Sequence, residues 1–143
     1  MNVSQSDIKV GLIPLNCGED LTGLEGRLVK LAAGPGPKAE ALLPTANTDI
    51  TPFLCVSGDE EDQEGSFQPF TGEQNHRVRA NGLGSAGDRL VLADTATPAD
   101  KGKVRALPAA PGTYEVIAIA EEDFVDEQLV KCRPIAARSV TVG

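Results

Sequence analysis

Glycine and proline are spaced so densely along this chain that they leave little room for long helices. The 143 residues include 15 Gly and 10 Pro, distributed between short apolar segments. Proline lacks the N–H that a helix interior needs, and glycine loses the most backbone freedom when it is ordered. We therefore expect short strands joined by tight turns, with little helix.

The segments between these turn residues are short and rich in Val, Leu and Ile, which is typical of strands. For residues 38–44 a single helical turn is an alternative to a strand. Residues 57–65 are expected to be an acidic loop, and residues 121–127 either a loop or a single helical turn. The predicted strands are 8–12, 26–31, 38–44, 49–58, 76–80, 88–94, 103–108, 113–120, 128–135 and 139–142. The pattern predicts a mainly β fold, either a small barrel or a sandwich.

The length is that of one ordinary domain, which can bury a core without disulfides. Aromatic residues make up only 3% of the chain and Trp is absent, so Val, Leu, Ile and Ala must build that core. We divide the chain into an N-terminal extension or arm, residues 1–22, and a single β-rich domain, residues 23–143.

Charge and cysteine content exclude several classes of protein. A net charge of -8 argues against a nucleic-acid partner, because phosphate binding needs a surplus of Lys and Arg. Cys17, Cys55 and Cys132 are odd in number and form no C-x-x-C, so neither a disulfide framework nor a zinc site is expected. No apolar run is long enough to span a membrane and no export signal is evident, so we expect a soluble protein made in a reducing compartment.

Residues 82–87 read GLGSAG and match the glycine pattern of a dinucleotide-binding turn. That motif must be followed by a helix whose N-terminus faces the pyrophosphate. Here DRLVLAD follows, which has the composition of a strand. We therefore interpret the glycines as a connection between two neighbouring antiparallel strands.

The sequence offers little support for a catalytic site or a metal-binding site. His76 is the single histidine, and its polar neighbours indicate an exposed strand end rather than a nucleophile's base. The acidic run DEEDQE, residues 59–64, lacks the spacing of a calcium loop. We expect no catalytic residue, metal or cofactor; a hydrolase would have to depend on His76 or on an acidic pair.

The segment TYEVIAIA, residues 113–120, is apolar on both faces. Tyr114 and Val116 lie on one face of the expected strand, and Ile117 and Ile119 lie on the other. Such a strand is either central in a sheet or part of an oligomer interface. These four residues are therefore the candidate oligomer interface.

Successive segments GRLVKL, GDRLVLAD, GKVRALP, GTYEVIAIAEE and DEQLVKCRP form a strand pattern spread over residues 23–136. This pattern resembles the capsid decoration, or cement, proteins of tailed bacteriophages. The resemblance implies a small β-barrel or β-sandwich of the β-tulip kind, a homotrimer made in the host cytoplasm and located on the outer surface of the virion. Its partner would be the major capsid protein, and its role would be to stabilise the expanded head without catalysis.

Under this resemblance the N-terminal residues are the candidate capsid contact, because Ile8, Val10, Leu12 and Ile13 could form an extended segment that adds a strand to a capsid edge. The same residues could instead form the first strand of the domain's own sheet. A different function also stays open, namely a cytoplasmic β-barrel module that binds a small ligand or peptide.

Overall fold

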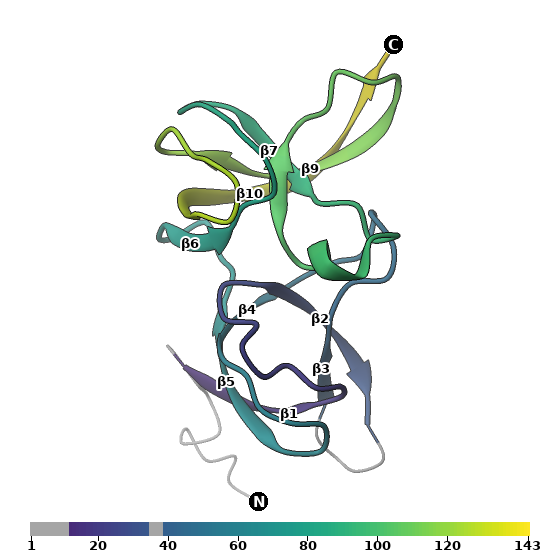
Figure 1. Cartoon of the computed structure of the whole chain (residues 1–143), viewed down its shortest axis with the longest axis vertical. Helices are drawn as coiled ribbons and strands as arrows, with labels where there is room; N and C mark the ends of the chain where they lie inside the picture. Colours follow the sequence, from purple (N-terminus) through teal and green to yellow (C-terminus); the bar gives the residue numbers. More distant parts are fainter. Residues whose placement is uncertain (1–11, 35–38) are drawn as a thin grey trace, which may run out of the picture.

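The computed structural model describes residues 12–34 and 39–143, and it is nearly all β, which confirms the predicted fold class (Figure 1). In these residues no helix is long and apolar enough to cross a membrane. The elements are β1 (Ile13–Cys17), β2 (Leu28–Ala33), β3 (Ala39–Leu42), β4 (Phe53–Ser57), β5 (Glu64–Pro69), β6 (His76–Arg79), β7 (Arg89–Leu92), the 3-10 helix η2 (Pro98–Asp100), β8 (Val104–Ala106), β9 (Gly112–Ala120) and β10 (Leu129–Val142).

The first five strands close into a barrel in the order β1-β3-β2-β4-β5, here called the barrel lobe. β1 closes it by pairing parallel with β3 and antiparallel with β5, where Ile13 lies opposite Phe67. Phe67 is fully buried and packs in the barrel core with Cys17, Leu21 and their neighbours. Residues 13–22, which the sequence assigned to an extension, therefore belong to the barrel, and at Ile13 the alternative of an intrinsic first strand holds.

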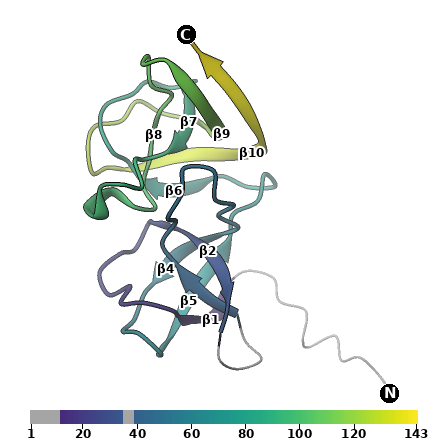
Figure 2. The same cartoon turned by 90° about the vertical axis from the view of Figure 1, so that its right-hand side faces the viewer.

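The remaining strands form a five-stranded sheet in the order β6-β10-β9-β7-β8, here called the sheet lobe. β9 is a central strand between β10 and β7, as one interpretation of its two apolar faces predicted. β10 is one long strand with a bulge between Pro134 and Arg138, where the sequence had indicated two strands. Figure 2 shows β10 turning sharply, so that its second half projects from the molecule together with the start of β9.

The two lobes are joined by a shared core. Leu28 and Leu54 of the barrel lobe pack in the same buried cluster as Val78, Leu90 and other sheet-lobe residues. The Leu28 N–H donates to the Gly102 carbonyl oxygen at 2.8 Å. Gly102 has φ +82°, and a Cβ there would lie 2.7 Å from the Leu28 carbonyl oxygen, so only glycine fits this contact.

A buried lysine reinforces the sheet lobe beside this junction. Lys103 is 4% exposed, and its ammonium bonds Asp100 at 3.0 Å and also Glu127. Burial opposes the ammonium charge, but the two carboxylates outweigh that effect and raise the pKa of Lys103. The Arg27 guanidinium donates from the barrel lobe to the Lys101 carbonyl oxygen at 2.9 Å. Backbone, apolar and charged contacts thus hold the lobes together.

Two local predictions from the sequence were wrong. β5 begins at Glu64, inside the predicted acidic loop, because Phe67 is buried and the following residues continue its pairing with β4. β6 and β7 lie in the same sheet but are separated by β10 and β9, so GLGSAG does not connect neighbouring strands.

Candidate functional site

A largely apolar cleft of about 320 Å³ lies where the two lobes meet. Residues of the barrel lobe line one side and residues around the β10 bulge line the other. The lining residues are Thr48, Asp49, Ile50, Thr51, Pro52, Phe70, Glu115, Ile117, Pro134, Ile135 and Ala137. Ile50 is 82% exposed at the cleft and Ile135 is 38% exposed, so the site offers apolar surface to a partner.

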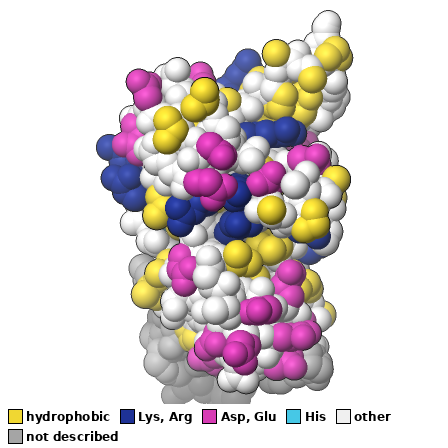
Figure 3. Space-filling model, in the orientation of Figure 1, with side chains coloured by type: hydrophobic (Ala, Val, Ile, Leu, Met, Phe, Trp, Pro, Cys, Tyr) yellow, Lys and Arg dark blue, Asp and Glu magenta, His cyan; other side chains and the backbone are white. Residues whose placement is uncertain are grey.

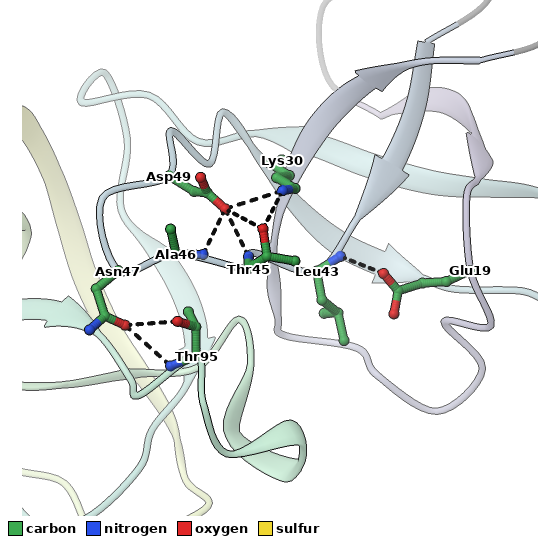
Figure 4. Close-up of polar contacts among 8 residues, drawn as sticks. All are labelled: Glu19, Lys30, Leu43, Thr45, Ala46, Asn47, Asp49 and Thr95. Atoms are coloured by element: carbon green, nitrogen blue, oxygen red, sulfur yellow. Dashed lines mark hydrogen bonds and ion pairs between the residues drawn. The ribbon is translucent and has the colours of Figure 1, made fainter.

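The loop that carries Ile50 is held by polar contacts on both sides (Figure 4). The Asp49 carboxylate accepts the N–H groups of Thr45 and Ala46 at 2.8 and 3.0 Å and pairs with the Lys30 ammonium at 3.3 Å. Burial opposes its charge, but these contacts outweigh that effect and lower the pKa of Asp49.

Contacts to other loops extend this support. The Asn47 side-chain oxygen accepts from the Thr95 N–H at 3.2 Å and from its hydroxyl at 3.0 Å, which ties the loop to the sheet lobe. Figure 4 also shows the Leu43 N–H donating to Glu19. The barrel side of the cleft is therefore preorganised.

The other side of the cleft includes residues at the β10 bulge. β6 pairs with β10 only at residues 129–132, whereas β9 pairs with β10 as far as Val142. Among the described residues, no strand pairs with the second edge of β10 beyond residue 132. An open edge next to an apolar cleft can accept an extended peptide by strand addition.

The structure places the predicted interface residues at different depths. Val116 is fully buried within the chain, whereas Tyr114, Ile117 and Ile119 are half-buried. Ile117 alone among the four lines the cleft. The Tyr114 hydroxyl donates to the Ala110 carbonyl oxygen at 3.0 Å in the projecting hairpin.

Of the predicted N-terminal capsid contact, the structure describes Leu12 and Ile13. Ile8 and Val10 lie outside the described residues. Leu12 is 56% exposed and Ile13 is half-buried in β1. Leu12 and Ile13 are not among the residues that line the cleft, and of the lining residues the sequence singled out Ile117 alone.

His76 does not lie at an exposed strand end as expected from its neighbours. It is 4% exposed, packs against the Phe70 ring at 5.2 Å between centroids, and donates through Nε2 to the Thr71 carbonyl oxygen at 3.2 Å. Burial lowers its pKa. These contacts indicate a structural role for the His76 ring, and none of them is with a nucleophilic side chain.

Cysteines and carboxylates do not assemble into a reactive site in the described residues. Cys17, Cys55 and Cys132 are free and buried, and burial raises the pKa of Cys55 and of Cys132 to about 12. Such thiols are poor nucleophiles and poor metal ligands. Over residues 12–34 and 39–143 no group of three His, Cys, Asp or Glu side chains could hold a metal ion.

Of the GLGSAG glycines, Gly84 faces protein, whereas a Cβ on Gly82 or Gly87 would meet open space. Gly84 forms a two-way backbone bridge with Phe124, with N···O distances of 3.1 and 3.0 Å. A Cβ on Gly84 would lie within 2.9 Å of three atoms of the Phe124 ring. The close approach that a dinucleotide turn reserves for pyrophosphate is therefore taken by an aromatic ring.

Comparisons with known proteins extend this description at the level of the fold. No protein-family model matches the sequence, and no curated protein does either. Among solved structures, the chain is similar to the head fiber gp8.5 N base of bacteriophage phi29, with a TM-score of 0.65 over 87% of this chain and 92% of that chain. The two share a fold. Their sequence identity is 16%, so the likeness carries no further property by itself.

Proposed function

We propose that this chain is a non-enzymatic structural protein of a bacteriophage head, located on the outer surface of the virion. The observation that carries the proposal is the fold that this chain shares over most of its length with the base of a phage head fiber. The strand pattern of residues 23–136 supports it independently, because it resembles phage decoration proteins.

In this role the chain binds the major capsid protein in the assembled shell and stabilises the expanded head. A ligand that binds only the assembled state stabilises it by mass action, by about 2.7 kcal/mol per site when the free ligand is at 100 times its Kd. Decoration sites repeat over the shell, so modest binding at each site adds up against the outward pressure of packaged DNA. The net charge of -8 is compatible with a surface that avoids that DNA.

We propose further that the chain acts as a homotrimer, as the decoration resemblance implies. The projecting part of the β9–β10 hairpin supports this, because an isolated two-stranded ribbon is marginally stable and gains from packing against a neighbour. Tyr114 and Ile119 are half-buried candidates for that packing.

Co-sedimentation with purified expanded heads tests the proposal. We expect the chain to pellet with heads at a fixed ratio to the major capsid protein, and to raise the temperature at which the shells rupture. The mass of the free chain from light scattering should correspond to three copies. A monomer that remains in the supernatant at all concentrations would contradict the proposal.

The cleft favours a second candidate function, the binding of an extended apolar peptide. Its apolar lining next to the open edge of β10 is the observation in favour. An Ile50→Ser variant should weaken peptide binding in a phage-display selection on the purified chain. If selection yields a peptide sensitive to this variant while heads are not bound, the second function replaces the first.

A further inference from the structure

The glycine-rich segment 81–88 and the acidic connection 121–128 together present two apolar side chains on the surface of the sheet lobe. The Gly84–Phe124 bridge is antiparallel, so its register places Leu83 opposite Val125. Phe124 is buried, whereas Leu83 is 75% exposed and Val125 is 58% exposed. The bridge thus leaves the Phe124 ring facing inward over Gly84 and the side chains of Leu83 and Val125 facing outward. We call the outward pair the apolar knob.

Side chains of the two segments hold the knob in place. The Gly82 N–H donates to Asp126 at 2.8 Å, and the Ala86 N–H donates to Asp123 at 2.9 Å. Asp88 accepts the Ser85 N–H at 2.9 Å. These contacts satisfy backbone groups that a loose loop would leave to water. A preordered surface loses little conformational entropy when it binds a partner.

Three carboxylates at the knob form no ion pair among the described residues, although Arg77 and Arg79 bond other parts of the acidic connection. Asp88, Asp123 and Asp126 accept backbone N–H groups, and none of the three forms an ion pair with another described residue. Figure 3 shows hydrophobic and acidic side chains next to each other at the upper left of the sheet lobe. A partner must therefore combine an apolar pocket with a basic rim.

The same charge selects among partners. A second copy also carries a net charge of -8, and the inter-lobe cleft that could receive a knob is lined by the acidic residue Glu115. Nucleic acid has the wrong sign as well. A protein surface with Lys or Arg around an apolar depression fits both features of the knob.

We propose that the apolar knob, Leu83 with Val125, is a docking point for the capsid shell, inserted into an apolar pocket of a shell subunit that Lys or Arg side chains border. The identity of this partner rests on the proposed function. The knob lies in the sheet lobe and β1 lies in the barrel lobe, so this contact is separate from Ile13 of the predicted N-terminal contact. Burial of these two aliphatic side chains in an apolar pocket would favour binding through the hydrophobic effect.

Quantitative co-sedimentation with purified expanded heads tests the docking point. The double variant Leu83→Ser/Val125→Thr should bind heads at least about tenfold more weakly than the unchanged chain. Asp123→Asn/Asp126→Asn retains the side-chain oxygens that accept the N–H groups but removes two charges, so it should weaken binding mainly at low salt. Leu31→Ser, at an exposed apolar position of β2, is the matched control and should bind normally.

Melting temperature and light-scattering mass are measured for every variant. Equal binding by the folded double variant would overturn the docking point while leaving the proposed function intact. A change in oligomer mass would also overturn it, because the knob would then contact a second copy. Absence of binding by the unchanged chain would contradict the proposed function itself, and the shell as partner with it.

Discussion

Replacing Gly84 with Ala tests whether segment 81–88 is held against Phe124. Backbone strain plays no part, because Gly84 does not have a positive φ. The new Cβ would lie within 2.9 Å of three ring atoms, the nearest at 2.1 Å, against about 3.5–4.0 Å for ordinary carbon contacts, so the ring must move by roughly 1.5 Å. Phe124 is 3% exposed in the shared core, and overpacking of this kind costs about 1–3 kcal/mol.

We therefore expect Gly84→Ala to lower the free energy of unfolding by about 2–3 kcal/mol, which corresponds to a fall in Tm of about 5–10 °C for a chain of this size. Urea unfolding followed by circular dichroism measures the first quantity, and calorimetry measures the second. Gly82→Ala is the control. That position has φ +84° and open space around the new Cβ, so only left-handed strain of about 1 kcal/mol applies.

A second variant separates crowding from other causes. In Gly84→Ala/Phe124→Leu the smaller side chain makes room for the methyl group, so the combined loss should be smaller than the sum of the two single losses. If Gly84→Ala is no more destabilising than Gly82→Ala, or if the two changes simply add, the ring does not pack over Gly84. The preorganised knob would then lose its physical basis.

Three further predictions concern buried polar groups. Burial lowers the pKa of His76 from 6.5, so on acidification the unfolded chain binds a proton on this residue at a higher pH than the folded chain does. The free energy of unfolding should therefore decrease as the pH falls below about 6.5. Urea titrations should show this decrease for the unchanged chain and not the His76 part of it for His76→Gln. Lys103→Met leaves two carboxylates without their ammonium and should cost about 1–3 kcal/mol in urea unfolding; an unchanged midpoint would refute this ion-pair assignment. Iodoacetamide at pH 8 should leave Cys55 and Cys132 unmodified in the folded chain but alkylate both in denaturant, and mass spectrometry measures the extent of alkylation. Rapid alkylation of the folded chain would contradict the burial of these thiols.

Local sequence patterns predicted much of the strand content but not the pairing. Segments such as 89–92 have branched residues between glycine-rich turns, and their strand character is local information. Closure of the barrel depends on β1 meeting both β3 and β5, which are far from it in sequence. Division into a barrel and a separate sheet is likewise a property of non-local pairing, so it was not predicted.

The errors have identifiable causes. β5 was missed because Ser66, Pro69 and the glycines around them resemble a turn, although Phe67 lies at the centre of the barrel core. β10 was divided because Pro134 cannot donate a ladder hydrogen bond, and the strand bulges there instead of ending.

The environment of His76 could have been predicted from the sequence. Strand alternation that turns Val78 inward also turns His76 inward, and this signal outweighs the polar neighbours. The knob and the cleft could not have been found in this way. Leu83 and Val125 are 42 residues apart in the chain, and only the folded structure brings them together.

Electron cryomicroscopy of purified expanded heads, with and without a saturating amount of the chain, tests the central proposal most directly. We expect additional density on the outer surface of the shell, repeated with the shell symmetry, into which the barrel and sheet lobes fit as one body. Identical reconstructions with and without the chain would contradict it.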